Sequence, residues 1–112
     1  VSIAIAQAAV ESGWGTSRFA LEGNALFGQW TYSGEGLKPL DNDDSKHKVM
    51  QFKIIIASVK AYKKNLNTHS SYTEFRDARA MLRSQNEKVS GLKLTKYLHK
   101  YAAAGDKYIK KI

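Results

Sequence analysis

Apolar and polar positions along the chain predict a succession of helices around one short β region. Residues 2–12 are small or apolar almost throughout, which predicts a largely buried helix whose polar exceptions are Gln7 and Glu11. Gly13 and Gly15 follow at once. Glycines end a helix at that place because they accept left-handed backbone angles.

A second, shorter helix is expected directly after this turn. Thr16 or Ser17 can cap it, because a hydroxyl side chain accepts a hydrogen bond from the first free backbone N–H groups. The helix runs through Glu22, and Gly23 with Asn24 supplies a stop that tolerates left-handed angles.

The pattern then changes from helical to alternating. Residues 26–32 are aromatic and partly alternating, residues 33–36 have turn chemistry, and residues 49–54 alternate again. These segments predict a small antiparallel hairpin with a polar excursion around residues 41–46.

The rest of the chain has the helical period. Helices are expected from beyond Ile56 to about Asn67, from Tyr72 to about Arg83, over residues 92–101, and from near Lys107 onward. Ser70 or Ser71 is expected to cap the second of these. Their predicted inward side chains are Phe75, Ala78, Ala80, Met81, Leu92, Leu94, Tyr97, Leu98 and Tyr101. The pattern predicts an α+β fold, mainly helical with a small antiparallel β-hairpin lobe.

Length and composition predict one domain over residues 1–112, since 112 residues with 43% apolar content can build one hydrophobic core. Val1 already lies in an apolar run and the last residues have no cap, so we expect a domain truncated at both ends, with other domains in a longer chain. No stretch approaches the roughly 20 apolar residues of a membrane span. The absence of cysteine excludes a disulfide framework and thiolate catalysis.

The net charge of +8 favours acidic polymers as partners. Nucleic acid, anionic lipid and the acidic polymers of a bacterial wall all qualify. The lysines are spaced like the wet faces of helices, so a simply solvated surface remains an alternative. No nucleic-acid module or phosphate-binding glycine loop is recognisable, so we expect no nucleic-acid partner.

Glu11 is the strongest candidate for chemistry. A carboxylate near the C-terminal end of a buried helix faces the negative end of the helix dipole, which opposes its charge. That dipole and apolar neighbours would raise the pKa of the carboxyl group. Glycosidic cleavage requires a protonated acid, because the leaving alcohol is too basic to depart without a proton. A solvent-facing glutamate at a frayed helix end is the alternative.

Aromatic side chains near Glu11 could form platforms on which sugar rings stack, or could be core. They are Trp14, Phe19, Phe27, Trp30 and Tyr32. Asn24 can present its amide to the acetamido group of a sugar or simply terminate its helix.

A second carboxylate is harder to place than Glu11. The acidic residues of the predicted hairpin lobe could face Glu11 across a cleft or could simply be solvated; they are Glu35, Asp41, Asp43 and Asp44. A separation of about 5 Å from Glu11 would favour a covalent nucleophile, and roughly 6.5 to 9.5 Å an activated water. The 2-acetamido oxygen of the substrate offers a third route. His47, His69 and His99 lack metal-ligand spacing, so we expect neither metal nor cofactor.

The string AIAQAAVESGWGTSRFALEGNALFGQW resembles the signature segment of the glucosaminidase family, glycoside hydrolase family 73. The later segments KNLNTHSSYTEFR and SGLKLTKYLHKYAAAGDKYIKKI resemble its Bax-like branch, and only the hairpin region matches loosely. The resemblance implies a lysozyme-like fold and hydrolysis of the β-1,4 bond after N-acetylglucosamine in peptidoglycan. It also implies a periplasmic or extracellular protein associated with the cell envelope.

Carried over by position, the resemblance makes Glu11 the general acid and Tyr101 an orienting or transition-state-stabilising hydroxyl. Asn24, Phe27 and Trp30 fall in the part of the motif that lines the sugar groove, and Trp14 is expected to bind substrate with them. Relatives often carry their second acidic residue between positions 41 and 51, where Lys46 and Lys48 intrude here, so Asp43 and Asp44 are candidates together with Asp41. A wall-binding module without turnover is the alternative function.

Overall fold

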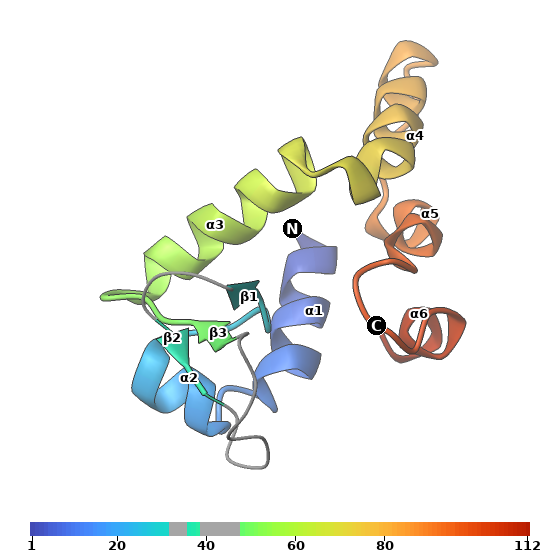
Figure 1. The fold of residues 1–112 in the computed structure, drawn as a ribbon. Helices are drawn as coiled ribbons and strands as arrows, with labels where there is room; N and C mark the ends of the chain where they lie inside the picture. The colour runs from blue at the N-terminus through green and yellow to red at the C-terminus, as the bar shows by residue number, and fades with distance from the viewer. Residues whose placement is uncertain (32–35, 39–47) are drawn as a thin grey trace. The chain divides into compact units, whose positions relative to one another are not determined.

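A computed structural model describes residues 1–31, 36–38 and 48–112. Its elements in chain order are α1 (Ser2–Ser12), α2 (Arg18–Gly23), β1 (Trp30–Thr31), β2 (Gly36–Leu37), β3 (Lys48–Met50), α3 (Ile55–Thr68), the 3-10 turn η1 (Ser70–Tyr72), α4 (Thr73–Ser84), α5 (Gly91–Thr95), the 3-10 turn η2 (Lys96–Leu98) and α6 (Asp106–Lys111) (Figure 1). The predicted α+β class, mainly helical with a small antiparallel sheet, is confirmed. Among the described residues, no helix is long and apolar enough to span a membrane.

The chain forms two compact units. One comprises residues Gln7–Tyr62, and the other comprises Val1–Ala6 together with Lys63–Ile112. The first, which we call the sheet unit, holds α2, the three strands and parts of α1 and α3. The second, which we call the helical unit, holds α4 to α6. The prediction of a single domain stays a prediction.

The turn after α1 is fixed by hydrogen bonds at the helix end. The Trp14 N–H donates to the Ala9 carbonyl at 2.8 Å, a bond that closes a helix around a left-handed residue, and Gly13 has the required φ of +58°. The buried Ser12 hydroxyl donates to the Ala8 carbonyl and accepts from the Gly15 N–H. The predicted glycine stop is therefore confirmed.

The prediction that α1 is largely buried is wrong. Only Gln7 and Ser12 are buried, and Ile5 is 65% exposed. Because the helix has no continuous polar face, its sequence does not predict which of its sides is buried. Most of the other residues of α1 are partly exposed.

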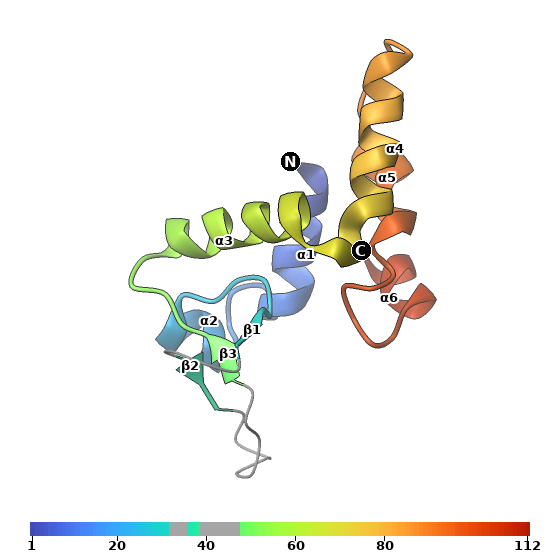
Figure 2. The same cartoon turned by 45° about the horizontal axis from the view of Figure 1, so that its top comes forward.

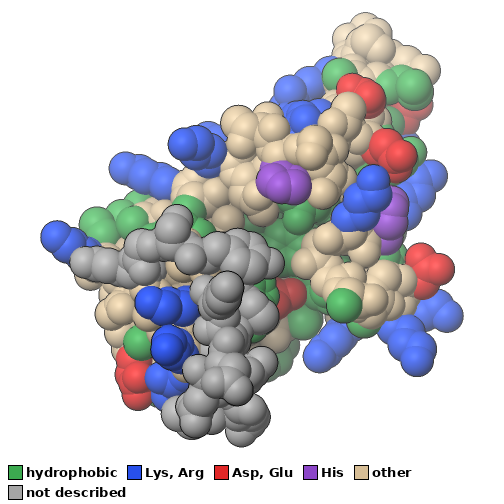
Figure 3. Space-filling model, viewed as in Figure 1, with side chains coloured by type: hydrophobic (Ala, Val, Ile, Leu, Met, Phe, Trp, Pro, Cys, Tyr) green, Lys and Arg blue, Asp and Glu red, His purple; other side chains and the backbone are tan. Residues whose placement is uncertain are grey.

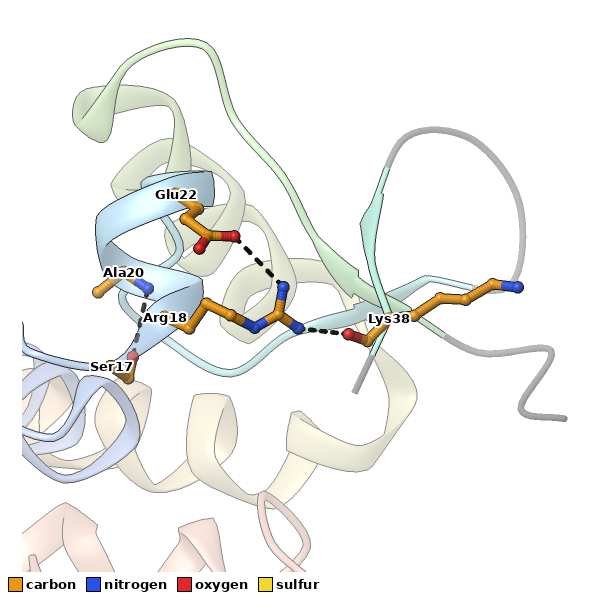
Figure 4. A network of polar contacts seen from close by, with 5 residues as sticks. All are labelled: Ser17, Arg18, Ala20, Glu22 and Lys38. Carbon is orange, nitrogen blue, oxygen red and sulfur yellow. Dashed lines mark hydrogen bonds and ion pairs between the residues drawn. The ribbon is translucent and has the colours of Figure 1, made fainter. Parts of the chain in front are cut away.

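Helix α2 begins and ends as its sequence predicts. The Ser17 hydroxyl accepts from the Ala20 N–H at 3.2 Å, and Asn24 follows the helix with a φ of +50°. Arg18 in the first turn pairs with Glu22 at 3.3 Å and also donates to the Lys38 carbonyl just after β2 (Figure 4). Arg18 thus connects α2 to the end of β2.

The three strands form one antiparallel sheet in the order β1-β3-β2, with β3 between the other two (Figure 1). Trp30 pairs with Val49, which confirms the predicted pairing of the two alternating segments. The strands are shorter than predicted, because residues 51–54 leave the sheet before α3. Strand β2 was not predicted, since Gly36 was assigned to a turn; it pairs with Met50 instead.

The sheet unit has a core built around two stacked rings. Phe27 and Tyr62 lie with ring centroids 4.0 Å apart and an interplanar angle of 13°. Both are buried, and Ala25 and Val49 are buried as well. Tyr62 comes from α3, so this stack joins α3 to the segment that leads into β1.

In the helical unit, Arg76 of α4 satisfies backbone carbonyls at the end of α3. It donates to the Leu66 carbonyl at 3.0 Å and to the His69 carbonyl at 2.8 Å. The prediction that Ser70 or Ser71 caps α4 is wrong. His69 caps the 3-10 turn η1 by accepting from the Ser71 N–H, and α4 continues from that turn without a side-chain cap.

The predicted helix over residues 92–101 is broken into α5 and η2, which lie against α4 (Figure 2). Leu94 and Leu98 are buried as expected. Met81 and Leu92 were expected to face inward, but they are 59% and 87% exposed. Met81 lies six positions after the buried Phe75, and Leu92 lies two positions before the buried Leu94, so at about 100° per residue both point away from the buried side of their helix.

Candidate functional site

The Glu11 carboxyl group lies against the backbone of Gly28. A methyl group built onto Gly28 would come within 2.6 Å of Glu11 Oε2 and 3.4 Å of its Cδ. Real Cβ atoms do not come that close to another heavy atom, so only glycine leaves the carboxyl its place. Gly28 has a φ of +61°, which also favours glycine. An alanine at position 28 would therefore displace the end of the Glu11 side chain, and the positive φ would strain it as well.

Glu11 itself is half-buried and is the penultimate residue of α1. It stands in the last turn of the helix, where the negative end of the helix dipole opposes its charge, as the sequence predicted. The carboxyl group is thus neither sealed in the core nor extended freely into solvent.

A buried hydrogen bond lies one helical turn before Glu11. The Tyr62 hydroxyl donates to Gln7 Oε1 at 2.7 Å, and the Gln7 side chain is fully buried. Residues four apart share one face of a helix, so Gln7 and Glu11 point to the same side of α1. Tyr62 also stacks on Phe27, the residue before Gly28. These contacts link α1 to the backbone against which the Glu11 carboxyl lies.

Trp14 stands in a strained and exposed turn. Gly13, Trp14 and Gly15 all have positive φ, and Trp14 has a φ of +57°. A bulky residue in this region costs about 1–3 kcal/mol, and such strain concentrates at functional sites. The Trp14 side chain is 85% exposed. The turn therefore presents a large apolar ring to solvent three residues after Glu11.

The other predicted binding residues occupy different environments. Trp30 is 50% exposed at the start of β1. Phe27 is 4% exposed with one ring face covered by Tyr62, which favours its packing alternative. Asn24 terminates α2, and its Nδ2 donates to the Phe52 carbonyl at 2.9 Å, which favours the structural alternative for its amide nitrogen.

Tyr101 belongs to the helical unit. Its ring lies 6.0 Å from that of Tyr72 and 5.9 Å from that of Tyr108, with which it is stacked. Tyr108 is 5% exposed, so its ring is part of the packed interior of the helical unit. The position of Tyr101 toward a substrate stays a prediction.

The candidates for a second carboxylate lie outside the described residues. They are Glu35, Asp41, Asp43 and Asp44. The choice among a covalent nucleophile, an activated water and the substrate acetamido group is thus still a matter of prediction.

Two of the three histidines have structural contacts. His69 caps η1, and His99 Nδ1 lies 3.3 Å from the Lys96 carbonyl. His47 lies outside the described residues. Within residues 1–31, 36–38 and 48–112, no group of three or more His, Cys, Asp or Glu side chains could hold a metal ion.

An open cavity of about 520 Å³ lies in the helical unit between α4 and the α5–η2 segment. It is lined by apolar Met81, Leu92 and Tyr97 together with charged groups such as Asp77 and Lys93. None of the predicted site residues lines it, so the predicted chemistry does not depend on this cavity.

Basic side chains appear at several separate points on the face drawn in Figure 3. On α4, burial lowers the pKa of Arg79, and the neighbouring Arg83 and Arg76 lower it further. Such a surface attracts acidic polymers without selecting one of them.

Sequence reasoning missed four residues that contact the acid or hold the elements next to it. They are Gln7, Ser12, Gly28 and Tyr62. Gln7 was noted as a polar exception in an apolar helix, and that exception was the available signal, because a buried amide needs a partner. Gly28 gave no signal of its own, since a close approach to another side chain cannot be read from spacing.

Fold and site geometry together define a mainly helical α+β domain with a glutamate at the end of its first helix. Residues 1–112 match the glucosaminidase family, described as mannosyl-glycoprotein endo-beta-N-acetylglucosaminidase. The chain belongs to this family of glycoside hydrolases. It is similar to protein bax of Escherichia coli (strain K12), with 39% identity over 108 residues, which cover 96% of this chain and 38% of that relative. No solved structure matches the chain.

Proposed function

We propose that this protein hydrolyses the β-1,4 bond after N-acetylglucosamine in peptidoglycan, with Glu11 as the general acid. Membership of the glucosaminidase family supports glycoside hydrolysis in general. The observation that carries the finer proposal is the half-buried Glu11 carboxyl, which lies against Gly28 at the end of α1. An acid held in this way can be protonated by solvent and still be aimed at one point.

The proposed reaction begins with proton transfer. The Glu11 carboxyl gives its proton to the glycosidic oxygen, the C–O bond breaks, and positive charge develops on the sugar ring. Tyr101 is proposed to orient the sugar or stabilise this charge. Asp43 or Asp44, water or the acetamido oxygen of the substrate then captures the anomeric carbon.

Substrate binding is proposed to use the exposed rings near the acid. Trp14 is 85% exposed and Trp30 is 50% exposed, so both present part of an apolar ring to solvent, where a sugar face could stack. Asn24 and Phe27 would support this surface more through their packing than through direct contact. The net charge of +8 would favour the acidic polymers of a bacterial wall, and we propose a periplasmic or extracellular location in the cell envelope.

Digestion of purified peptidoglycan tests this proposal. The protein is incubated with the wall polymer, new reducing ends are labelled by borohydride reduction, and the labelled sugar is identified after acid hydrolysis. We expect labelled N-acetylglucosamine. Labelled N-acetylmuramic acid would contradict the proposed bond, and binding to the polymer without new reducing ends would support a wall-binding module instead.

A further inference from the structure

Gln7 and Tyr62 form a polar contact in the apolar interior of the sheet unit. The Gln7 side chain is 0% exposed and Tyr62 is 5% exposed, while their side chains are joined at 2.7 Å. Burying two polar groups is unfavourable unless they bond to each other, so an apolar pair of the same shape could stabilise the core as well. A polar pair gives in addition a fixed distance and direction between the two elements that carry it.

The two elements that carry this pair, α1 and α3, are both connected to the surroundings of Glu11. Gln7 lies on the Glu11 face of α1, one turn earlier, and Tyr62 lies on α3. The ring of Tyr62 makes a second contact, since it is stacked on the ring of Phe27 with the centroids 4.0 Å apart. Phe27 in turn precedes the glycine that touches the Glu11 carboxyl. We call this set the Glu11 frame: Gln7, Tyr62, Phe27 and Gly28.

We propose that Tyr62 is a positioning residue for Glu11, and that Gly28 is the surface on which the carboxyl rests. Tyr62 holds α1 through its hydroxyl group and the 27–28 segment through its ring. It therefore sets the distance between the helix that carries the acid and the backbone behind the acid. This inference rests on the proposed role of Glu11 and adds residues that do not touch the substrate.

The Gly28 surface is tested by Gly28→Ala with Gly13→Ala as its matched control. Both glycines have nearly the same φ, +61° and +58°, so alanine meets similar backbone strain at both. The contacts differ, because the added Cβ meets Glu11 Oε2 at 2.6 Å in the first case and nothing closer than 3.6 Å in the second. A carboxyl displaced by about 1 Å loses on the order of 100-fold in rate, so we expect that fall in kcat for Gly28→Ala alone.

The role of Tyr62 is tested by Tyr62→Phe and by the double variant Gln7→Met with Tyr62→Phe. The single variant keeps the ring but leaves the buried Gln7 amide without this partner, so both stability and kcat should fall, kcat by roughly 10-fold. The double variant removes this bond from both sides, so the part of the stability loss that comes from the unpaired Gln7 oxygen should recover. If Tyr62 positions Glu11, kcat stays low in the double variant at unchanged KM. The pH profile of its rate is then also shifted relative to that of the unaltered protein, as it is in the single variant.

The outcomes separate this inference from the proposed function. Recovery of kcat together with stability in the double variant would assign the pair to packing alone. Equal rates for Gly28→Ala and Gly13→Ala would remove Gly28 as the carboxyl's support. If the unaltered protein cleaves no peptidoglycan, the proposed function fails. The frame is then judged by the carboxyl ¹³C resonance of Glu11, which must titrate differently in Gly28→Ala and Tyr62→Phe and identically in Gly13→Ala.

Discussion

Replacing Trp14 by glycine separates the backbone strain of the turn after α1 from the contribution of the exposed ring. Trp14 has a φ of +57°, a region that costs a residue with a Cβ about 1–2 kcal/mol. Glycine removes that cost but adds unfolded-state freedom worth about 0.5–1 kcal/mol. Little packing is lost, because the side chain is 85% exposed. Trp14→Gly should therefore be more stable than the unaltered protein by about 0 to 1.5 kcal/mol, the difference of these two terms.

Trp14→Ala is the matched control, since it removes the same ring and keeps the strain. We expect its stability in urea to equal or fall below that of the unaltered protein. Both variants should bind soluble glycan strands about tenfold more weakly, because an aromatic contact contributes about 1–1.5 kcal/mol. An alanine variant more stable than the glycine variant would refute the strain at position 14. Unchanged glycan affinity in both would refute the ring as a sugar platform.

Three further substitutions test other parts of the account. Arg76→Met removes the donor that satisfies the Leu66 and His69 carbonyls, so the free energy of unfolding in urea should fall by about 2 kcal/mol; no change would mean that water satisfies these carbonyls equally well. Ser17→Ala removes the cap of α2 and should cost about 1 kcal/mol in the same titration, whereas Ser17→Gly should cost only a few tenths. Tyr101→Phe keeps the stacked ring and removes the hydroxyl, so kcat on peptidoglycan should fall; an unaltered kcat would exclude the hydroxyl from the reaction.

Local signals in the sequence predicted the helix ends well. Ser17, Asn24 and the glycines after Ser12 act through hydrogen bonds and backbone angles within a few residues, and these are encoded where they act. Strand β2 could not be predicted in this way. A two-residue strand has no period of its own, and Gly36 enters the sheet only because β3 is there to pair with it.

Burial was harder to predict than helix formation. Leu92, Leu94 and Leu98 were all expected to face inward, yet Leu92 is 87% exposed while Leu98 is fully buried. Leu94 and Leu98 are four positions apart and share one side of the segment, whereas Leu92 lies two positions from Leu94 and points away from that side. An apolar residue is buried only where its position around the helix agrees with the covered side.

The residues of the candidate site also fall into those that the sequence predicts and those that only packing reveals. Glu11 was found from the sequence because a lone carboxylate in an apolar helix is conspicuous and because the surrounding string resembles a known family. Gly28 and Tyr62 were not found, since their importance lies in contacts across 17 and 55 positions of the chain. Such contacts arise only when the elements pack.

The most direct test of the central claim compares Glu11→Gln with Glu22→Gln on purified peptidoglycan. Both changes remove one carboxylate with almost no change in shape, and Glu22 lies on the exposed face of α2, where its pair with Arg18 contributes little. We expect Glu11→Gln to lower the rate of reducing-end formation by a factor on the order of 100 to 10,000, and Glu22→Gln to leave this rate unaltered. Equal rates for the two variants would contradict the assignment of Glu11 as the acid.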